Sequence, residues 1–530
     1  MQKIISLKLL PPEAADENAI TQYIASSEAI KITSISGFTI LKQSIDARSR
    51  QTWVNLSVRA FIHEPFQRRD VLSFTFKDVK KAEKKVVIIG AGPAGLFSAL
   101  KLIESGIKPL ILERGKDVRA RRRDLALLNK EGKVNPESNY CFGEGGAGTY
   151  SDGKLYTRSS KRGDVNRILN LFYHFGADEK ILYDAHPHIG TNKLPQIITA
   201  IRKKIIECGG EFLFEKKVTD FVIESAKLVG VKTQDGDLFD ADATILATGH
   251  SARDIFELLH SKKILIESKP FALGVRVEHP QSLIDTMQYH CLKRDAYLPP
   301  ASYSLVHQVN DKGVFSFCMC PGGIIAPAAT SPGELVVNGW SPSKRNNPYA
   351  NSGIVVSVEE KDAFAYLREK KYERQVNEDP LLLMRFQQFV EQKAFELGGG
   401  KFVAPAQRLI DFTESKLSSS LPNCSYVPGI HPAMLGEVLP SFIYRRLQKG
   451  FREFGRKMKG YLTNDAVVIA TESRTSSPVR IPRDRETLQH IQVENLYPCG
   501  EGAGYAGGIV SAAMDGERVA EQIAKSFVCN

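Results

Sequence analysis

The sequence predicts an α/β fold in which helices cover both faces of a parallel sheet, and three segments carry this prediction. Segment 85–113 reads as an apolar strand, a glycine-rich turn, a helix and a second apolar strand. A later apolar strand ends at Ala247-Thr248-Gly249, and segment 495–523 joins a strand, another glycine-rich turn and a helix. Strands without polar alternation are typical of parallel sheets that are buried on both faces. We therefore expect one sheet assembled from segments that lie far apart in the chain.

The turn in segment 85–113 has the spacing of a dinucleotide-binding site. Gly90 permits the tight turn, Gly92 lets the backbone approach a pyrophosphate, and Gly95 lets the helix pack against the strand. The N–H groups at the helix start then face the phosphates. Glu113 ends the second strand about 20 residues after Gly90, where a carboxylate accepts hydrogen bonds from ribose hydroxyls. The residues expected to hold the adenosine end are Gly90, Gly92, Pro93, Ala94, Gly95, Glu113 and Arg114.

The glycine-rich turn in segment 495–509 contains an acid and leads into a helix. Glu501 within this turn can reach a ribityl or phosphate-linked hydroxyl. The N-terminus of the helix that follows can stabilise negative charge on a reduced flavin. This turn therefore fits the opposite end of the same cofactor.

In this order, the three segments resemble the glutathione-reductase-like FAD superfamily. Segments 141–154, 317–323 and 471–480 further resemble a family of largely uncharacterised FAD-dependent dehydrogenases, so the resemblance spans most of the chain. It implies FAD as the cofactor and an oxidoreductase that transfers a hydride between a small-molecule substrate and flavin N5. Beyond the adenosine end, the residues implied to hold FAD are Gly145, Gly146, Gly148, Thr149, Asp152, Gly153, Lys154, Val218, Thr248, Gly249, Gly500, Glu501, Gly507, Gly508 and Ile509.

The resemblance and the pattern of turns together predict three domains. A small α+β domain, similar to a ferredoxin-like fold, is expected over 1–80, with a charged linker at 77–85. An FAD-binding Rossmann-like domain of the glutathione-reductase type is expected in two pieces, 84–265 and 465–530. Between these pieces, an inserted α+β domain over 270–460 is expected to cap the flavin and build the substrate pocket.

Two patterns inside these domains give specific expectations. Alternate residues from Val54 to Ala60 are apolar along a predicted strand at 51–61, so they share one face. A helical run is expected over 357–395 in the inserted domain.

A third glycine cluster, Gly143–Gly148, has the spacing of a dinucleotide-binding turn but a different context. Neither an apolar strand before it nor an apolar helix after it is present in the sequence. We interpret it as a loop along the FAD pyrophosphate and flavin edge, with a second dinucleotide site as the alternative. Another strand–turn–helix unit of this kind does not occur in the sequence. Its absence favours a flavin that exchanges electrons directly with the substrate rather than with a separately bound nicotinamide cofactor. Entry of NAD(P)H into the same pocket, as in a flavin reductase of an unsaturated substrate, stays open.

Three residues are candidates for the chemistry on the substrate. Arg474 lies in a segment rich in Ser and Thr, where an arginine can hold a substrate carboxylate or carbonyl. A turn held together by the Ser and Thr side chains is the structural alternative for this segment. Tyr505 lies in the flavin-side glycine turn as a pocket wall or proton donor. His431 is an acid/base candidate near the end of the inserted domain.

We interpret one pair of cysteines and one pair of histidines as structural residues. Cys318 and Cys320 flank one residue on a predicted strand and therefore point to the same face. We interpret them as small core residues, with dithiol chemistry as the alternative. His186 and His188 have a spacing that suits a metal ligand pair, but further ligands with matching spacing are missing nearby. No metal site is predicted.

Composition is typical of a large soluble protein with several domains. Of the 530 residues, 42% are hydrophobic and 25% are charged. An apolar run of about 20 residues, the length that spans a bilayer, does not occur. The N-terminal segment reads as a strand rather than a signal peptide, and the eight cysteines are scattered. We therefore expect reduced thiols and a cytoplasmic location.

The formal net charge of +11 has two interpretations. A basic surface draws anionic cofactors and anionic substrates, and it also attracts nucleic acid. The densest cluster, Arg119–Arg123, follows the predicted ribose acid and is partly offset by Asp117 and Asp124. We favour a solvated face beside an anionic ligand over nucleic acid as a partner. The alternative, a flavin-dependent RNA-modifying protein, requires this cluster and the inserted domain to form one continuous positive face.

Overall fold

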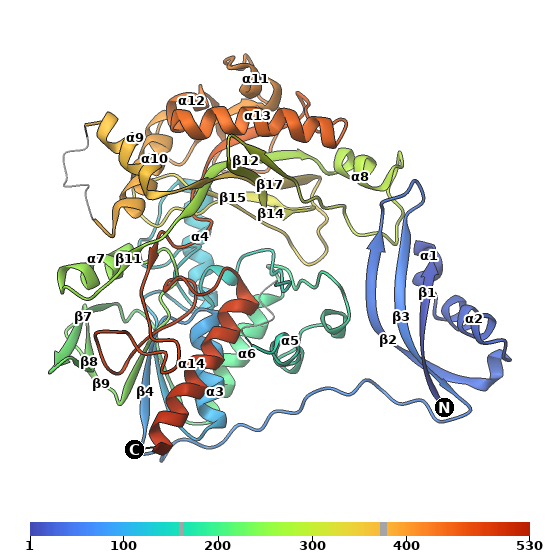
Figure 1. Cartoon of the computed structure of the whole chain (residues 1–530), viewed down its shortest axis with the longest axis horizontal. Helices are drawn as coiled ribbons and strands as arrows, with labels where there is room; N and C mark the ends of the chain where they lie inside the picture. Colours follow the sequence, from blue (N-terminus) through green and yellow to red (C-terminus); the bar gives the residue numbers. More distant parts are fainter. Residues whose placement is uncertain (158–162, 372–378, 530) are drawn as a thin grey trace.

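The computed structural model describes residues 1–157, 163–371 and 379–529, which form three regions (Figure 1). The N-terminal strands form a small sheet at one side of the molecule. A parallel sheet carries the turns predicted to bind a dinucleotide, and a larger sheet lies above it in the view. Within these residues, a helix that is both long enough and apolar enough to cross a membrane is absent.

Five parallel strands form the sheet of the nucleotide-binding region, in the order β22-β10-β4-β5-β6. The central strand is buried along Val86–Ile89, as expected for a sheet covered on both faces. Its neighbours come from distant parts of the chain, which confirms the predicted α/β fold. The strands are β4 (Lys85–Ile89), β5 (Lys108–Leu112), β6 (Glu211–Leu213), β10 (Ala243–Leu246) and β22 (Leu496–Pro498).

Helices α3 (Pro93–Glu104) and α14 (Ile509–Cys529) lie side by side against this sheet (Figure 1). Their backbones approach closely at Gly516, where an added Cβ would lie 2.2 Å from the carbonyl oxygen of Ala94. The Ser98 hydroxyl also donates a 3.0 Å hydrogen bond to the Gly516 carbonyl. This packing brings the N-termini of two helices to the same edge of the sheet.

The rest of the nucleotide-binding region surrounds these elements. A three-stranded antiparallel sheet, β7-β8-β9, packs beside β10. The additional elements are β7 (Val218–Glu224), β8 (Lys227–Thr233), β9 (Leu238–Asp240), α4 (Val118–Glu131), α5 (Val165–His174), α6 (Leu194–Glu207) and α7 (Arg253–Ser261).

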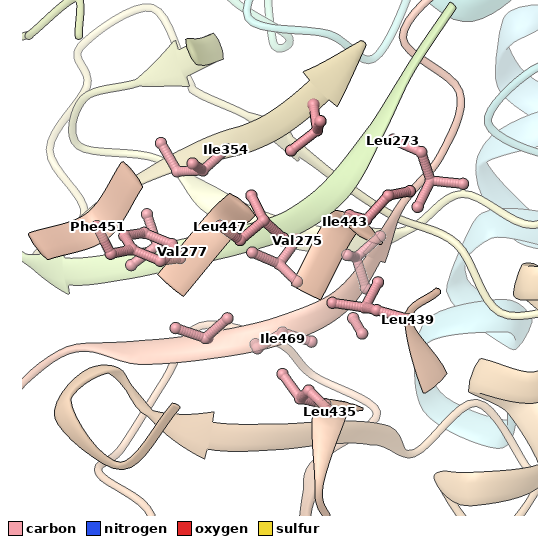
Figure 2. Close-up of a cluster of buried hydrophobic side chains, with 14 of the residues drawn as sticks. Leu273, Val275, Val277, Ile354, Leu435, Leu439, Ile443, Leu447, Phe451 and Ile469 are labelled. Atoms are coloured by element: carbon pink, nitrogen blue, oxygen red, sulfur yellow. The ribbon is translucent and has the colours of Figure 1, made fainter. Parts of the chain in front are cut away.

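A seven-stranded sheet forms the inserted region, in the order β13-β14-β17-β12-β20-β18-β19. Helix α13 (Ser441–Lys457) lies across this sheet, and Figure 2 shows Ile443, Leu447 and Phe451 packed near Val275 and Val277. The three helix residues are four positions apart, so they share one face. The strands are β12 (Phe271–Pro280), β13 (Val306–Val309), β14 (Lys312–Cys320), β17 (Tyr349–Val358), β18 (Ala404–Arg408), β19 (Ile430–Pro432) and β20 (Val467–Glu472).

Smaller elements complete the inserted region. Strands β15 and β16 pair as a two-stranded ribbon. These elements are β15 (Ile324–Pro327), β16 (Val337–Trp340), α8 (Gln281–Tyr289), α9 (Glu360–Glu369), α10 (Leu382–Leu397), α11 (Leu409–Glu414) and α12 (Leu435–Val438).

Two features of the inserted region differ from the sequence predictions. Strand β20 pairs with β12 and β18, so the inserted sheet extends beyond the expected limit at 460 to Glu472. An apolar strand buried on both faces fits either sheet, so its pattern could not assign it. The helical run expected over 357–395 is two helices, α9 and α10, and its part at 372–378 lies outside the described residues.

A short antiparallel ribbon marks the passage between the two larger regions. Strand β11 (Glu267–Ser268) pairs with β21 (Val479–Arg480). The chain therefore enters and leaves the inserted region at neighbouring points.

The N-terminal region is a three-stranded antiparallel sheet, β1-β3-β2, with two helices. Val54, Leu56, Val58 and Ala60 are all buried, which confirms that they share one face. A ferredoxin-like sheet has four strands, so this region differs from that expectation. The elements are β1 (Gln2–Leu9), α1 (Pro11–Ala14), α2 (Glu17–Glu28), β2 (Ile35–Asp46) and β3 (Trp53–Ile62).

Strand β2 docks this region onto the nucleotide-binding region. The Gln43 N–H donates to the Tyr183 carbonyl at 2.8 Å, and the Ala185 N–H donates to the Gln43 carbonyl at 2.9 Å. An ion pair between Arg69 and Glu179 adds a charged contact at 2.8 Å.

Candidate functional site

A cavity of about 400 Å³ lies between the carboxyl ends of the parallel strands and the inserted region. Ile89 and Leu112 line it at the ends of β4 and β5, where ligands bind in open parallel sheets. Gly507 and Gly508 line it just before α14. The inserted region and the segment that follows it contribute Phe317, Cys318, Asn338, Arg474 and Thr475.

The turn after β4 depends on glycine at two positions. Gly90 has a φ of 105°, and a Cβ there would lie 2.5 Å from the Ala247 carbonyl oxygen. A Cβ on Gly95 would lie 2.0 Å from the Gly90 carbonyl oxygen, so a side chain at either position would push strand, turn and helix apart. Gly92 faces the Gly143–Gly148 loop, since its Cβ position is 4.0 Å from the Cα of Gly146.

Glu113 joins three backbone segments at the end of β5. One carboxylate oxygen accepts from the Ala91 N–H at 2.9 Å, and the other accepts from Gly115 at 2.8 Å and Gly143 at 2.9 Å. The side chain is 4% exposed and lines the cavity. A carboxylate has further lone pairs, so these bonds leave it able to accept from a hydroxyl in the cavity.

Arg114 is held at the cavity wall by two acids and an aromatic ring. Its guanidinium donates to both carboxylate oxygens of Asp254, at 2.8 and 2.9 Å, and to Glu137 at 2.6 Å. It also lies over the ring of Phe142, with the guanidinium carbon 4.3 Å from the ring centroid. These contacts fix the orientation of the side chain.

Arg121 shapes the Gly143–Gly148 loop from inside the protein. Its fully buried guanidinium donates to the carbonyls of Asn139, Tyr140, Glu144 and Gly146 at 2.7 to 2.9 Å. This corrects the expectation that Arg119–Arg123 forms one solvated cluster: Arg121 supports a loop, whereas its exposed neighbours face solvent. The sequence carried a signal for this role, because the helical spacing places Arg121 on the buried face of α4. The apolar residues of that face are Val118, Leu125 and Leu128.

His250 is a cavity residue that the sequence predictions did not include. It follows Gly249 directly, and its Nδ1 lies 3.8 Å from a carboxylate oxygen of Glu501. Burial and the positive charges of Arg474 and Arg253 lower the pKa of His250, although Glu501 opposes them. A neutral imidazole can accept a proton. Its position next to the predicted cofactor contacts Thr248 and Gly249 was the signal available in the sequence.

Asp152 and Lys154 form an ionic cluster at the boundary with the inserted region. Asp152 pairs with Arg345 at 2.8 Å and with Lys154 at 3.4 Å. Lys154 also donates to the carbonyl of Met319. Asp152 is 1% exposed, and the charges of Lys154 and Arg345 hold its pKa below the usual value even though burial opposes this.

Arg474 lines the cavity but is already bound by buried acids. It donates to Glu391 at 3.0 Å, to Glu334 at 3.2 Å and to the Thr330 hydroxyl at 2.8 Å. Arg253 of α7 pairs with the same two acids, at 2.8 and 3.1 Å. The network therefore ties the inserted region to the nucleotide-binding region beside the cavity.

Most residues predicted to hold the cofactor do line this cavity. They come from both parts of the nucleotide-binding region. The lining residues are Gly90, Gly92, Pro93, Ala94, Glu113, Arg114, Gly146, Gly148, Asp152, Gly153, Lys154, Val218, Thr248, Gly249, Glu501, Gly507, Gly508 and Ile509, together with Arg474 among the substrate candidates.

The other predicted residues lie behind the wall or away from it. Gly145 and Thr149 contact each other inside the loop, and Gly500 donates its N–H to Asp515 at 2.8 Å. The Tyr505 hydroxyl accepts a 3.0 Å hydrogen bond from the backbone N–H of Arg483, and the guanidinium of Arg483 lies over the Tyr505 ring. The residues predicted for the site but absent from the cavity lining are Gly95, Gly145, Thr149, Gly500, Tyr505 and His431.

His431 lies on an edge strand and does not line the cavity. It is exposed on β19, at the edge of the inserted sheet, where it pairs with Pro405 of β18. The sequence placed it near the end of the inserted domain but could not show that β19 is an edge strand.

The residues around the cavity fit FAD. A Cβ added at Gly249, Gly507 or Gly508 would meet nothing within 4 Å, so these glycines border open space. Gly148 lies between Pro93 and Ile509, the first residues of α3 and α14, whose first-turn N–H groups have no acceptor within the helix. Such groups suit phosphates and a negatively charged flavin, and Glu113 suits a ribose.

Comparison with protein families and relatives gives the following similarities. Residues 270–475 match a family described as "FAD-dependent protein, C-terminal domain-like", residues 84–256 match "Pyridine nucleotide-disulphide oxidoreductase", and residues 1–61 match a domain of unknown function. An uncharacterised protein of Clostridium beijerinckii is 38% identical over 530 residues, which cover 97% of each chain. The thiamine thiazole synthase of Aeropyrum pernix is 24% identical over 176 residues, covering 33% of this chain and 53% of the relative.

Solved flavoenzyme structures are similar to a lower degree. Glycine oxidase from Bacillus cereus has 13% identity and a TM-score of 0.30, covering 84% of this chain and 96% of that chain. The halogenase PltM has 12% identity and a TM-score of 0.37, covering 84% of this chain and 69% of that chain.

Proposed function

This chain belongs to the same family as the uncharacterised Clostridium beijerinckii protein, with the domains of an FAD-dependent oxidoreductase, and we propose that it transfers a hydride between a small-molecule substrate and FAD. FAD, when bound, supplies the isoalloxazine ring that accepts or gives the hydride at N5. The residues of this chain would bind the cofactor, orient the substrate and exclude water.

One observation carries this proposal: two regions with separate sheets line a single cavity. Glu113 and the glycine turns line it from the nucleotide-binding region, and Phe317 and Asn338 line it from the inserted region. A substrate bound against Phe317 would be enclosed by the inserted region on one side and the cofactor on the other. Such enclosure orients the reacting atoms and removes water from between them.

His250 is the residue that we propose for proton transfer. It is 12% exposed at its side chain, lines the cavity, and has a lowered pKa that favours the neutral imidazole. A neutral imidazole beside the cavity can take a proton from a substrate hydroxyl or amine as the hydride leaves. Glu501, 3.8 Å away, would stabilise the imidazolium that results.

Two cations are proposed to serve the substrate in different ways. Lys154 lines the cavity and is half-buried, so its ammonium group can attract an anionic substrate. Arg474 is bound to Glu391 and Glu334, so we assign it a positioning role in holding the wall. This positioning role replaces the predicted role, in which Arg474 contacts the substrate directly.

Anaerobic reduction of the flavin tests the proposal. Purified protein with FAD bound is mixed separately with NADH, with NADPH and with a panel of small 2-hydroxy and 2-amino acids, and loss of flavin absorbance is followed. At least one of the small acids should bleach the flavin within minutes, faster than either nicotinamide.

Two outcomes would overturn this reading. Rapid bleaching by NADPH alone, with the acids inactive, would replace it with a nicotinamide-fed flavin reductase. Failure of every probe to bleach a flavin that dithionite does reduce would argue for a structural cofactor.

A further inference from the structure

Two thiols lie together at the cavity on a distorted strand. Cys318 lines the cavity and is half-buried, whereas Cys320 is fully buried two residues later on β14. The pairing of β14 with β17 shifts register between Phe317 and Cys320. Cys318 itself has a φ of 47°, a left-handed conformation that is uncommon for a residue with a side chain.

This distortion brings the Cys320 thiol close to the backbone of Cys318. In a regular strand, residues two positions apart are about 6.6 Å apart at Cα, near the upper limit for a disulfide. The left-handed residue interrupts that extension. The Cys320 thiol donates a 3.2 Å hydrogen bond to the Cys318 carbonyl oxygen, so its sulfur turns back toward Cys318. The extended geometry that would hold the two thiols apart is therefore absent at Cys318.

Two cations surround this pair. Lys154 donates to the carbonyl of Met319, the residue between the cysteines. Arg276 donates to the Cys318 carbonyl at 2.7 Å, lies 3.7 Å from the Cys320 sulfur and forms an ion pair with Glu472. The neighbouring Cys320 thiol, and then the charges of Lys154 and Arg276, hold the pKa of Cys318 well below its usual value although burial opposes this.

Packing alone explains Cys320 but not Cys318. The buried Cys320 agrees with the interpretation from sequence as a small core residue. Cys318 differs from that interpretation, because it lies at the cavity with a partner thiol and a nearby ammonium group. Such surroundings are typical of reactive thiolates rather than structural cysteines.

We propose that Cys318 and Cys320 form a redox-active dithiol that exchanges an electron pair with FAD. The proposal rests on the proposed function and names the second electron partner as a thiol or disulfide compound. In the oxidising direction the Cys320 S–H bond breaks and a Cys318–Cys320 S–S bond forms. Two electrons and the Cys320 proton pass to oxidised FAD, which becomes the reduced anion. In the reverse direction reduced FAD cleaves the disulfide, and thiol–disulfide exchange passes the electrons to an external disulfide.

Counting thiols without FAD gives the first test. The chain has eight cysteines, and mild oxidation with diamide should leave about six free thiols in the wild type. Peptide mapping should find Cys318 joined to Cys320. Cys318→Ser and Cys320→Ser should each keep all seven remaining thiols free, because the pair cannot form. Cys424→Ser removes a half-buried cysteine outside the cavity, and this variant should still form the Cys318–Cys320 disulfide.

Anaerobic redox titration gives the second test, with FAD bound. The oxidised wild type should consume about two electron pairs per flavin, one for FAD and one for the disulfide, whereas Cys318→Ser and Cys320→Ala should consume about one. Wild-type consumption of a single pair, with eight thiols free after diamide, would overturn the dithiol. Flavin bleaching by a small acid in that same protein would leave the proposed function standing, so the two failures are distinguishable.

The charge of Lys154 gives an independent readout in the apoprotein. Lys154→Met should slow alkylation of Cys318 by iodoacetamide at neutral pH by about 10-fold, because less thiolate is present. Alkylation of Cys424 in the same sample serves as the internal control, and it should be unchanged. Equal rates at Cys318 in the wild type and the variant would contradict an activated thiolate.

Discussion

The Gly143 N–H donates a 2.9 Å hydrogen bond to the Glu113 carboxylate, although 30 residues separate them. The same carboxylate also binds Ala91 and Gly115. Glu113 therefore fixes the position of the β4 turn relative to the Gly143–Gly148 loop, and it does so without a cofactor. A residue predicted to contact a ribose is thus also the point that joins two glycine-rich segments.

Replacing Glu113 by Gln should weaken FAD binding by about 10- to 100-fold. The amide keeps the shape but has one acceptor oxygen, so charged hydrogen bonds of about 1.5–3 kcal/mol are lost. Quenching of flavin fluorescence on binding measures the dissociation constant. Glu131→Gln, whose partner is the exposed Lys133, should bind FAD like the wild type, and equal affinity of both variants would contradict the role of Glu113.

Replacing Arg121 by Met should lower the free energy of unfolding by about 3 kcal/mol or more and abolish FAD binding. The carbonyls that its guanidinium satisfies would be left buried without donors. Urea denaturation followed by circular dichroism checks the stability. Arg123→Met changes an exposed residue of the same cluster and should shift stability by less than about 0.5 kcal/mol. Similar losses in the two variants would mean that Arg121 has no special role.

Replacing Gly508 by Ala should leave the fold intact and weaken FAD binding by roughly 10-fold. The new methyl meets no protein atom within 4 Å, so it would occupy space that the cofactor needs. The melting temperature of the apoprotein and the affinity for FAD are the two measurements. Gly313→Ala, on β14 with ordinary contacts at 3.6 Å, is the control. A variant with unchanged affinity would place FAD away from the start of α14.

The inserted region should lose stability as the pH rises from about 4.5 through 7. Glu278 is 2% exposed, and burial raises its pKa to about 7, against its bonds from Ser425. The folded state therefore keeps a proton that the unfolded state has released, and this favours unfolding as the pH rises. Between these pH values the free energy of unfolding should fall by up to about 3 kcal/mol because of Glu278, and Glu278→Gln should abolish this part of the fall. Denaturation at several pH values measures it, and Glu486→Gln, exposed, should keep the wild-type slope.

Replacing His250 by Asn should slow substrate-dependent flavin reduction by about 100-fold or more while FAD stays bound. General acid–base groups contribute about this much, and Asn cannot take up the proton. Stopped-flow absorbance under anaerobic conditions gives the rate. His260 is exposed on α7, and in the His260→Asn control the flavin should be reduced at the wild-type rate. An unchanged rate in His250→Asn would remove His250 from the mechanism.

The nucleotide-binding region was largely predictable because its constraints are local. Gly90 and Gly95 must be glycine to avoid backbone atoms only a few residues away or on a neighbouring strand. Such requirements leave a fixed spacing in the sequence, and Glu113 lies at the strand end where that spacing places it. The parallel sheet was predicted from its apolar strands, whereas the order of the strands came from the structure.

The substrate side was less predictable because it depends on contacts between remote segments. Arg474 lines the cavity, but only the fold shows that Glu391 and Glu334 already bind it. His431 and Tyr505 had suitable chemistry but lie outside the cavity lining. Nothing in their local sequence indicates which strand lies at an edge or which ring lies beneath an arginine.

By itself, then, the sequence determined that this protein has a dinucleotide turn and a parallel sheet, because glycine spacing and apolar strands record short-range steric limits. FAD as the cofactor was implied by the resemblance to a family of FAD-dependent dehydrogenases. Tertiary structure decided that Cys318, His250 and Lys154 lie around one cavity. Their meeting results from the packing of the inserted sheet over the strand ends. That packing arises from the summed burial of many apolar side chains, which no single motif encodes.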